Sequence, residues 1–171
     1  MARLSKKRSD KRWQTEDGDV WASKLEAIIF ERLNGRTDVS VRRCSEQEGD
    51  TFAYTTGVRS GCCGACGSGD IVQRRTYTPD LCLSPRSASV PGYDTPKRFL
   101  EIKGYFPGPK RNLLRAFLKT GPSLDLRLIL ERDQRATRSV TLLEYCHKFF
   151  KIPVHIWDGQ IPRSWYEWTQ N

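Results

Sequence analysis

The chain has 171 residues, 37% of them hydrophobic and 29% charged, and a formal net charge of +9. These totals suit one domain of ordinary size with a modest core, and they leave room for burial against a second subunit. No apolar run is long enough to span a membrane, and the basic N-terminus has no apolar segment of the secretory kind, so we expect a cytoplasmic protein without a membrane partner. The positive charge favours a polyanionic partner, nucleic acid before membrane.

The first 16 residues are rich in basic side chains and poor in apolar ones. The basic residues before Trp13 are Arg3, Lys6, Lys7, Arg8, Lys11 and Arg12, against the single acid Asp10. We interpret residues 1–16 as a flexible basic arm that neutralises phosphates, followed by one domain over residues 17–171. A solvated tail without a role is the alternative.

A first helix is predicted from near Asp17–Asp19 to a stop at Asn34-Gly35. Its apolar stripe consists of Ala22, Leu25, Ile28, Ile29 and Leu33. Glu26 lies within or beside this stripe, where a carboxylate is costly unless it is paired or binds a metal. The alternative is that Glu26 sits at the margin of the stripe with its carboxylate in water.

Two strands are predicted next, over residues 38–43 and 51–55, separated by a polar loop over 45–50. A cysteine-rich insertion over 58–72 then carries the pair Cys63-x-x-Cys66 among glycines. Such a pair is half of a tetrahedral zinc site, and six cysteines without an export signal favour a metal knuckle over disulfides. The missing ligands could be Cys62, Cys44, His155 or the same pair of another subunit. A glycine-rich loop with spare thiols is the alternative.

The chemistry of the chain is predicted around Asp80 and a strand over residues 99–103. Because side chains alternate along a strand, Glu101 and Lys103 share one face while Ile102 faces the other way. Asp80 follows a proline and opens another short strand. Two acids and a lysine on neighbouring strands can hold a divalent metal and activate water beside a phosphate. Taken singly, Asp80 could instead be a turn residue and Glu101 with Lys103 an exposed ion pair.

The rest of the chain predicts a strand–helix–strand unit and a final helix. A proline-rich loop over 84–96 precedes the strand at 99–103, and a helix over 110–119 follows it, stopped by a Gly-Pro pair. That helix carries an apolar face of Leu113, Leu114, Phe117 and Leu118 and an outer ridge of Arg111, Arg115 and Lys119, which suits a phosphate backbone or simply faces water. Alternating leucines from Leu124 to Leu130 then predict a strand of a partly parallel sheet. Thr141-x-x-Glu144 is a capping box for a last helix through Phe150.

Taken together, these residues resemble the PD-(D/E)xK nuclease superfamily, with Pro79-Asp80 and Glu101-Ile102-Lys103 on adjacent strands and a helical Glu26 upstream. An ordered set of motifs looks more specifically like phage endonuclease I, the family of podophage enzymes that resolve Holliday junctions. From about Leu25 to Trp165, the set comprises Tyr77-Thr78-Pro79-Asp80, Glu101-x-Lys103-Gly104, Leu124-Asp125-Leu126-Arg127-Leu128-Ile129, Glu144-Tyr145-Cys146-x-Lys148-Phe149 and Ile161-Pro162-x-x-Trp165.

The resemblance implies an α/β fold with a PD-(D/E)xK nuclease-like mixed sheet flanked by helices. It also implies a domain-swapped homodimer, in which residues 17–44 of one chain complete the active site of the other and residues 45–50 bridge the two halves. In this family such an enzyme is a Mg²⁺-dependent (or Mn²⁺-dependent) endodeoxyribonuclease acting on branched DNA, and a phage-encoded member works in the cytoplasm of the host cell.

The resemblance also assigns roles to individual residues. Asp80 and Glu101 hold the metal, helped by the backbone carbonyl of Ile102, and Glu26 supports a second metal or its water. Lys103 orients the attacking water or neutralises charge in the transition state.

Two departures from the family pattern bear on substrate preference: the cysteine-rich insertion over 58–72 and a longer loop over 84–96. Two other functions stay open at this point. One is a duplex-specific or restriction-like nuclease on the same fold, for which unbranched DNA would be the better substrate. The other is a non-catalytic zinc-containing DNA-binding protein, which would bind DNA without magnesium-dependent cleavage.

Overall fold

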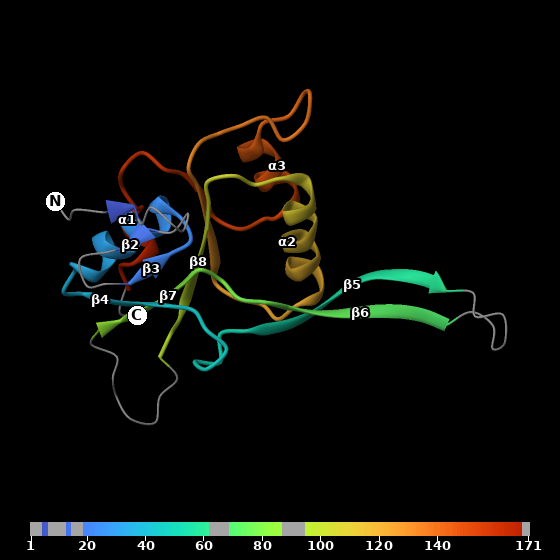
Figure 1. Cartoon of the computed structure of the whole chain (residues 1–171), viewed down its shortest axis with the longest axis horizontal. Coiled ribbons are helices and arrows are strands. Elements are labelled where there is room, and N and C mark those ends of the chain that lie inside the picture. Colours follow the sequence, from blue (N-terminus) through green and yellow to red (C-terminus); the bar gives the residue numbers. More distant parts are fainter. Residues whose placement is uncertain (1–4, 7–12, 15–18, 62–68, 87–94, 169–171) are drawn as a thin grey trace.

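Five strands form a mixed central sheet in the computed structural model, which describes residues 5–6, 13–14, 19–61, 69–86 and 95–168. The strand order is β10 (Val154–Ile156), β9 (Leu126–Leu130), β8 (Arg98–Lys103), β7 (Leu81–Pro85) and β4 (Val39–Arg43). Figure 1 shows α1 on one side of this sheet and α2 with α3 on the other. These helices span Lys24–Asn34, Gly108–Thr120 and Leu142–Phe149. The predicted class, a mixed sheet flanked by helices, is confirmed.

The strands change direction in the middle of the sheet. β4 and β8 run antiparallel to β7, whereas β8, β9 and β10 run parallel to one another. Because α2 links the parallel strands β8 and β9, the predicted strand–helix–strand unit is present. Because β7 runs opposite to β8 and β9, the end of the sheet at which β7 begins is also the end at which β8 and β9 finish. We call this the Lys103 end, and the opposite end the Arg98 end.

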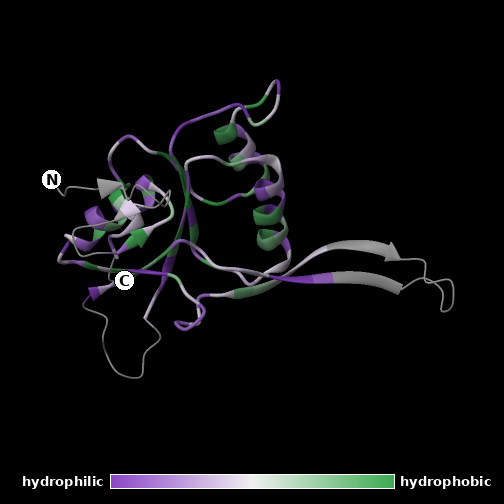
Figure 2. Ribbon diagram, viewed as in Figure 1, coloured by the Kyte–Doolittle hydropathy of each residue, from purple (hydrophilic) through white to green (hydrophobic). Residues whose placement is uncertain are grey.

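Two apolar cores lie on the two faces of the sheet. One includes Ile29 of α1 with Leu100 and Ile102 of β8, and the other includes Phe99 of β8 with Phe117 of α2. β8 thus contributes alternate residues to the two cores, as its sequence predicted. Figure 2 shows hydrophobic residues concentrated along the central strands, between the helices. In the part of the chain that the structure describes, no helix is long and apolar enough to cross a membrane.

The first helix begins later than its sequence predicted. It starts at Lys24 rather than near Asp17–Asp19, because Ser23 caps it and accepts a hydrogen bond from the amide of Glu26 (3.2 Å). The preceding pair, Val20–Trp21, forms the short strand β3 instead. The end of the helix at Asn34 agrees with the prediction.

Helix α2 corrects two predictions about its faces. Leu113, expected on the inner face, is 38% exposed. Arg111, expected on an outer basic ridge, turns inward and donates to the backbone carbonyls of Phe106 (2.6 Å) and Ala136 (2.9 Å). Arg115 is exposed, as predicted.

The two strands on either side of the cysteine-rich segment pair with each other and not with the central sheet. They are β5 (Phe52–Gly61) and β6 (Gly69–Tyr77), and they run antiparallel from a root at Phe52 and Tyr77 to a far end at Gly61 and Gly69. Figure 1 shows this hairpin projecting away from the body of the protein. Thr120, at the end of α2, exchanges hydrogen bonds with the backbone of β5 and braces the root. We call β5 and β6 the hairpin arm.

The segment before the hairpin arm is a tight turn. The amide of Asp50 donates to the carbonyl of Ser45 (3.0 Å), and Gly49 has a positive φ of 72° that suits glycine. This turn is the predicted loop over 45–50, and it leads from β4 into β5. Because β4 pairs with β7 of the same chain, one chain completes the sheet by itself. The exchange of residues 17–44 between two copies stays a prediction.

The N-terminal region contains a small three-stranded antiparallel sheet of β1 (Ser5–Lys6), β2 (Trp13–Gln14) and β3 (Val20–Trp21). Arg43, at the end of β4, donates to the carbonyl of Val20 (2.9 Å) and ties this sheet to the central one. The described residues of the predicted arm over 1–16 are thus paired in strands, and its other residues lie outside the described part of the chain.

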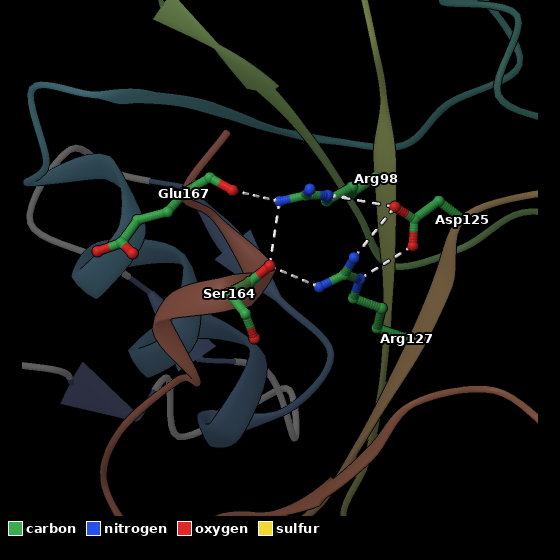
Figure 3. Close-up of polar contacts among 5 residues, drawn as sticks. All are labelled: Arg98, Asp125, Arg127, Ser164 and Glu167. Atoms are coloured by element: carbon green, nitrogen blue, oxygen red, sulfur yellow. Dashed lines mark hydrogen bonds and ion pairs between the residues drawn. The ribbon is translucent and has the colours of Figure 1, made fainter. Parts of the chain in front are cut away.

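The C-terminal segment packs back on the Arg98 end of the sheet. Asp125, just before β9, accepts hydrogen bonds from Arg98 (3.2 Å) and from Arg127 (2.9 Å). The same two guanidinium groups donate to backbone carbonyls of the segment that contains the 3-10 helix η2 (Arg163–Trp165). The cluster, drawn in Figure 3, consists of Arg98, Asp125, Arg127, Ser164 and Glu167. The C-terminal segment is therefore fixed to the domain.

Candidate active site

Asp80 stands where the hairpin arm joins the central sheet, three residues after β6 and directly before β7. Two backbone hydrogen bonds fix it: its amide donates to the carbonyl of Leu100 (3.0 Å), and its carbonyl accepts from the amide of Cys44 (3.2 Å). Its carboxylate oxygen Oδ2 accepts from the backbone amide of Ile102 (2.6 Å). The carboxylate of Asp80 is therefore held against the edge of β8 at the Lys103 end.

Glu101 and Lys103 point to the same face of β8 and form an ion pair, and the Lys103 ammonium also lies 3.3 Å from Oδ2 of Asp80. Glu101 is only 5% exposed, so the alternative of an exposed ion pair does not hold. Burial, and then the negative charge of Asp80, raise the pKa of Glu101 to about 7. Burial opposes the charge of Lys103, but the two carboxylates outweigh it and hold the pKa of the ammonium above its usual value.

Glu26 reaches the Lys103 end from the opposite face of the sheet. It lies in the first turn of α1, partly buried, and its carboxylate accepts a hydrogen bond from the hydroxyl of Ser23 (2.8 Å). Burial, and then the charge of Asp80, raise the pKa of Glu26, while Lys103 is among the groups that lower it. One chain thus brings all four predicted residues to one end of the sheet.

Tyr77 makes a contact in this site that the sequence did not predict. Its hydroxyl donates to Oε2 of Glu101 (2.6 Å), across 24 residues of chain. Its ring packs on Phe117 of α2 with centroids 4.1 Å apart. Burial, and then Glu101, raise the pKa of Tyr77 well above its usual value, so the hydroxyl keeps its proton. No sequence signal could have shown this, because the motif that contains Tyr77 does not reveal which distant side chain it meets.

The oxygen atoms at the Lys103 end suit a hard divalent cation. Within a strand the N–H and C=O of one residue point to the same edge, so the carbonyl of Ile102 projects toward Asp80, as its amide does. Each oxygen of Glu101 accepts one hydrogen bond and keeps a further lone pair. Among the described residues no three His, Cys, Asp or Glu side chains form a metal-binding group. Mg²⁺, however, commonly uses one or two carboxylates and otherwise water and phosphate, so the residues present fit it.

The predicted zinc site falls mostly outside the described residues, which exclude Cys62, Cys63 and Cys66. Cys44 lies beside Asp80 at the root of the hairpin arm, whereas Gly61 ends the ten-residue strand β5. At ~3.3 Å per residue, the two ends of β5 at Phe52 and Gly61 are about 30 Å apart. Burial also raises the pKa of the Cys44 thiol. Cys44 follows the edge strand β4, whereas His155 lies on β10 at the other edge of the sheet, so these two candidate ligands are far apart.

The surface has a pocket that lies away from Asp80, Glu101 and Glu26. Its volume is about 290 Å³, and it is lined by Arg32, Leu33, Arg36, Gln160, Ile161 and Tyr166. These residues belong to the end of α1 and the C-terminal segment, near the Arg98 end. A phosphate within a polymer needs an accessible edge more than an enclosed cavity, and the side chains of Asp80 and Lys103 are 23% and 18% exposed. We therefore assign the candidate active site to the Lys103 end.

No protein-family model, curated protein or solved structure matches this chain. The fold and the site define the chain as a mixed α/β protein. A cluster of two carboxylates and a lysine lies where β7 begins and β8 ends.

Proposed function

We propose that the chain is a metal-dependent endodeoxyribonuclease with a site of the PD-(D/E)xK type, which hydrolyses phosphodiester bonds in branched DNA such as four-way Holliday junctions. The observation that carries the proposal is the convergence of Asp80, Glu101 and Lys103 at the Lys103 end, joined by Glu26 from α1. The resemblance of the ordered sequence motifs to phage endonuclease I supports the same activity.

The chemistry follows from the side chains present. When bound, a Mg²⁺ ion supplies charge stabilisation at the phosphate and a more acidic water. Asp80 and Glu101, with the carbonyl of Ile102, provide the oxygens that hold it. Lys103 touches both carboxylates, and from there its ammonium can hold the attacking water or neutralise charge that develops on the phosphate. Glu26 adds a carboxylate that can support a second ion or its water.

The net charge supports a polyanionic substrate, and a symmetric homodimer, which we propose as the active form, would suit a branched one. A formal charge of +9 favours a polyanion. A four-way junction requires two strands to be cut, and a symmetric homodimer would present two sites. In a swapped dimer, α1 and β4 of one copy would make with the other copy the contacts that they make here with β7 of their own chain. We propose this swapped homodimer as the active form.

Cleavage with Mg²⁺ of a four-way junction, compared with a linear duplex of the same arms, tests the proposal. We expect paired nicks near the branch point and little cutting of the duplex, and no cutting by Glu101→Gln on either substrate. Equal cutting of both would leave a nuclease without junction preference. Tight binding without any cutting would replace the proposal with a non-catalytic DNA-binding protein.

A further inference from the structure

We infer that Tyr77 is a positioning residue of the acidic site, whose hydroxyl fixes the carboxylate of Glu101 in the orientation that holds the metal ion. This inference rests on the proposed function and goes beyond it, because the proposed chemistry uses only groups that touch the metal, the water or the phosphate. Tyr77 is the last residue of β6, so the residue that ends the hairpin arm also contacts the site.

The two oxygens of Glu101 have different partners. The Lys103 ammonium pairs with Oε1, and the Tyr77 hydroxyl donates to Oε2 at 2.6 Å. Rotation about the terminal bond of a glutamate is otherwise soft, because that torsion has broad minima. A carboxylate held only by Lys103 could turn toward the ammonium and away from Asp80. The second hydrogen bond removes this freedom and leaves one lone pair of each oxygen for an ion.

The hydroxyl is itself held in place from two sides. The Tyr77 ring packs on Phe117, which is 1% exposed in the core under α2. On the hairpin arm, Tyr77 pairs directly across from Phe52 of β5, whose ring also meets Phe117 (centroids 6.4 Å apart). Helix α2 therefore packs on the ring and β5 pairs with its backbone, and removing only the oxygen of Tyr77 would leave both contacts intact.

Replacing a residue that orients a metal-binding side chain usually lowers metal affinity or activity. Loss of such a partner typically costs about 10-fold to 100-fold in metal affinity or activity. Because Glu101 is nearly fully buried, water cannot readily replace the lost donor. Tyr77→Phe should therefore act on metal binding and turnover, and not on DNA binding.

The chain offers a matched control in Tyr54 of β5. Tyr54 is 5% exposed, and its ring meets the same Phe117 (5.7 Å between centroids), but the tyrosine hydroxyl that donates to Glu101 is that of Tyr77. We would compare Tyr77→Phe and Tyr54→Phe with the unchanged protein in three measurements. These are Mn²⁺ binding by calorimetry without DNA, kcat and KM on a four-way junction, and the melting temperature.

For Tyr77→Phe we expect about 10-fold to 100-fold weaker Mn²⁺ binding and a lower kcat, with KM and junction affinity in EDTA within about twofold. Tyr54→Phe should match the unchanged protein. If Tyr77→Phe cuts and binds Mn²⁺ normally, the inference is wrong while the nuclease stands. A fall in melting temperature with normal Mn²⁺ affinity would reduce Tyr77 to a structural residue and equally overturn it. If the unchanged protein neither binds Mn²⁺ nor cuts DNA, the proposed function itself fails.

Discussion

Asp80 and Ile102 are joined by a hydrogen bond of 2.6 Å from the backbone amide of Ile102 to the carboxylate of Asp80. Pairing between β7 and β8 ends at Leu81 and Leu100, so beyond that point a side chain takes the place of the missing backbone partner. The carboxylate of Asp80 thus belongs to the hydrogen bonding of the sheet. It has a structural role as well as a place in the proposed chemistry.

Asp80→Asn should separate these two roles. The amide oxygen of asparagine can still accept from Ile102, whereas the negative charge is lost. We expect junction cleavage to fall by at least about 100-fold with junction affinity in EDTA unchanged within a few-fold. Asp80→Ala, which also loses the hydrogen bond, should in addition unfold at a lower temperature. Cleavage by Asp80→Asn at the normal rate would show that the site lies elsewhere.

Mixing two inactive variants tests whether residues 17–44 are exchanged between copies. In a swapped dimer, a heterodimer of Glu26→Gln and Asp80→Asn chains contains one site with both carboxylates intact. We therefore expect the mixture, after unfolding and refolding together, to regain nicking of a single strand. If each chain completes its own site, the mixture will cut no faster than the Glu26→Gln protein alone.

Glu101 should make the stability of the metal-free protein depend on pH. Its pKa is raised from 4.5 to about 7 in the fold. Between these values the folded chain binds more protons than the unfolded chain, so stability is highest below about pH 4.5 and falls as the pH rises through about 7. Glu101→Gln removes the ionisation and should abolish this fall in stability between about pH 5 and pH 8, which amounts to at most about 3 kcal/mol, although the variant also loses the ion pair with Lys103 at both pH values.

Urea unfolding in EDTA at pH 5 and pH 8 measures this fall in stability, which should be present in the unchanged protein and absent from Glu101→Gln. Added Mg²⁺ should restore stability at pH 8 in the unchanged protein and not in Glu101→Gln. A variant that is destabilised equally at both pH values would show that Glu101 matters through its packing and not through its charge.

Arg42 and Asp50 form an ion pair at the turn before the hairpin arm. Asp50 is 1% exposed and accepts two hydrogen bonds from the guanidinium of Arg42. Because Arg42 is itself a third exposed, we expect Arg42→Ala to cost about 2–3 kcal/mol of unfolding free energy, somewhat less than a fully buried pair. The double variant Arg42→Ala/Asp50→Ala should recover part of this loss.

The exposed pair of Arg36 with Asp38 provides the control for that measurement, since both side chains are more than a third exposed. Asp38→Ala should change the unfolding free energy by less than about 1 kcal/mol. A similar loss for Arg42→Ala and Asp38→Ala in denaturant unfolding would mean that the burial of Asp50 has no energetic consequence.

The sequence by itself determined the elements whose signals are local. Alternation along residues 99–103 correctly put Glu101 and Lys103 on one face and Ile102 on the other. The capping box of Thr141 with Glu144 is present and opens α3. These predictions held because a strand period or a cap involves residues only two or three apart, and the backbone geometry between such residues is nearly fixed.

Only the tertiary structure decided which elements meet. The strands β5 and β6 alternate like those of the central sheet, yet they pair with each other, because alternation specifies the face of a strand and not its partner. The start of α1 at Lys24 depended on which of several polar residues caps it, and Ser23 does. The contact of Tyr77 with Glu101 joins residues far apart in the chain, and it exists because α2 and the hairpin arm together fix the tyrosine ring against β8.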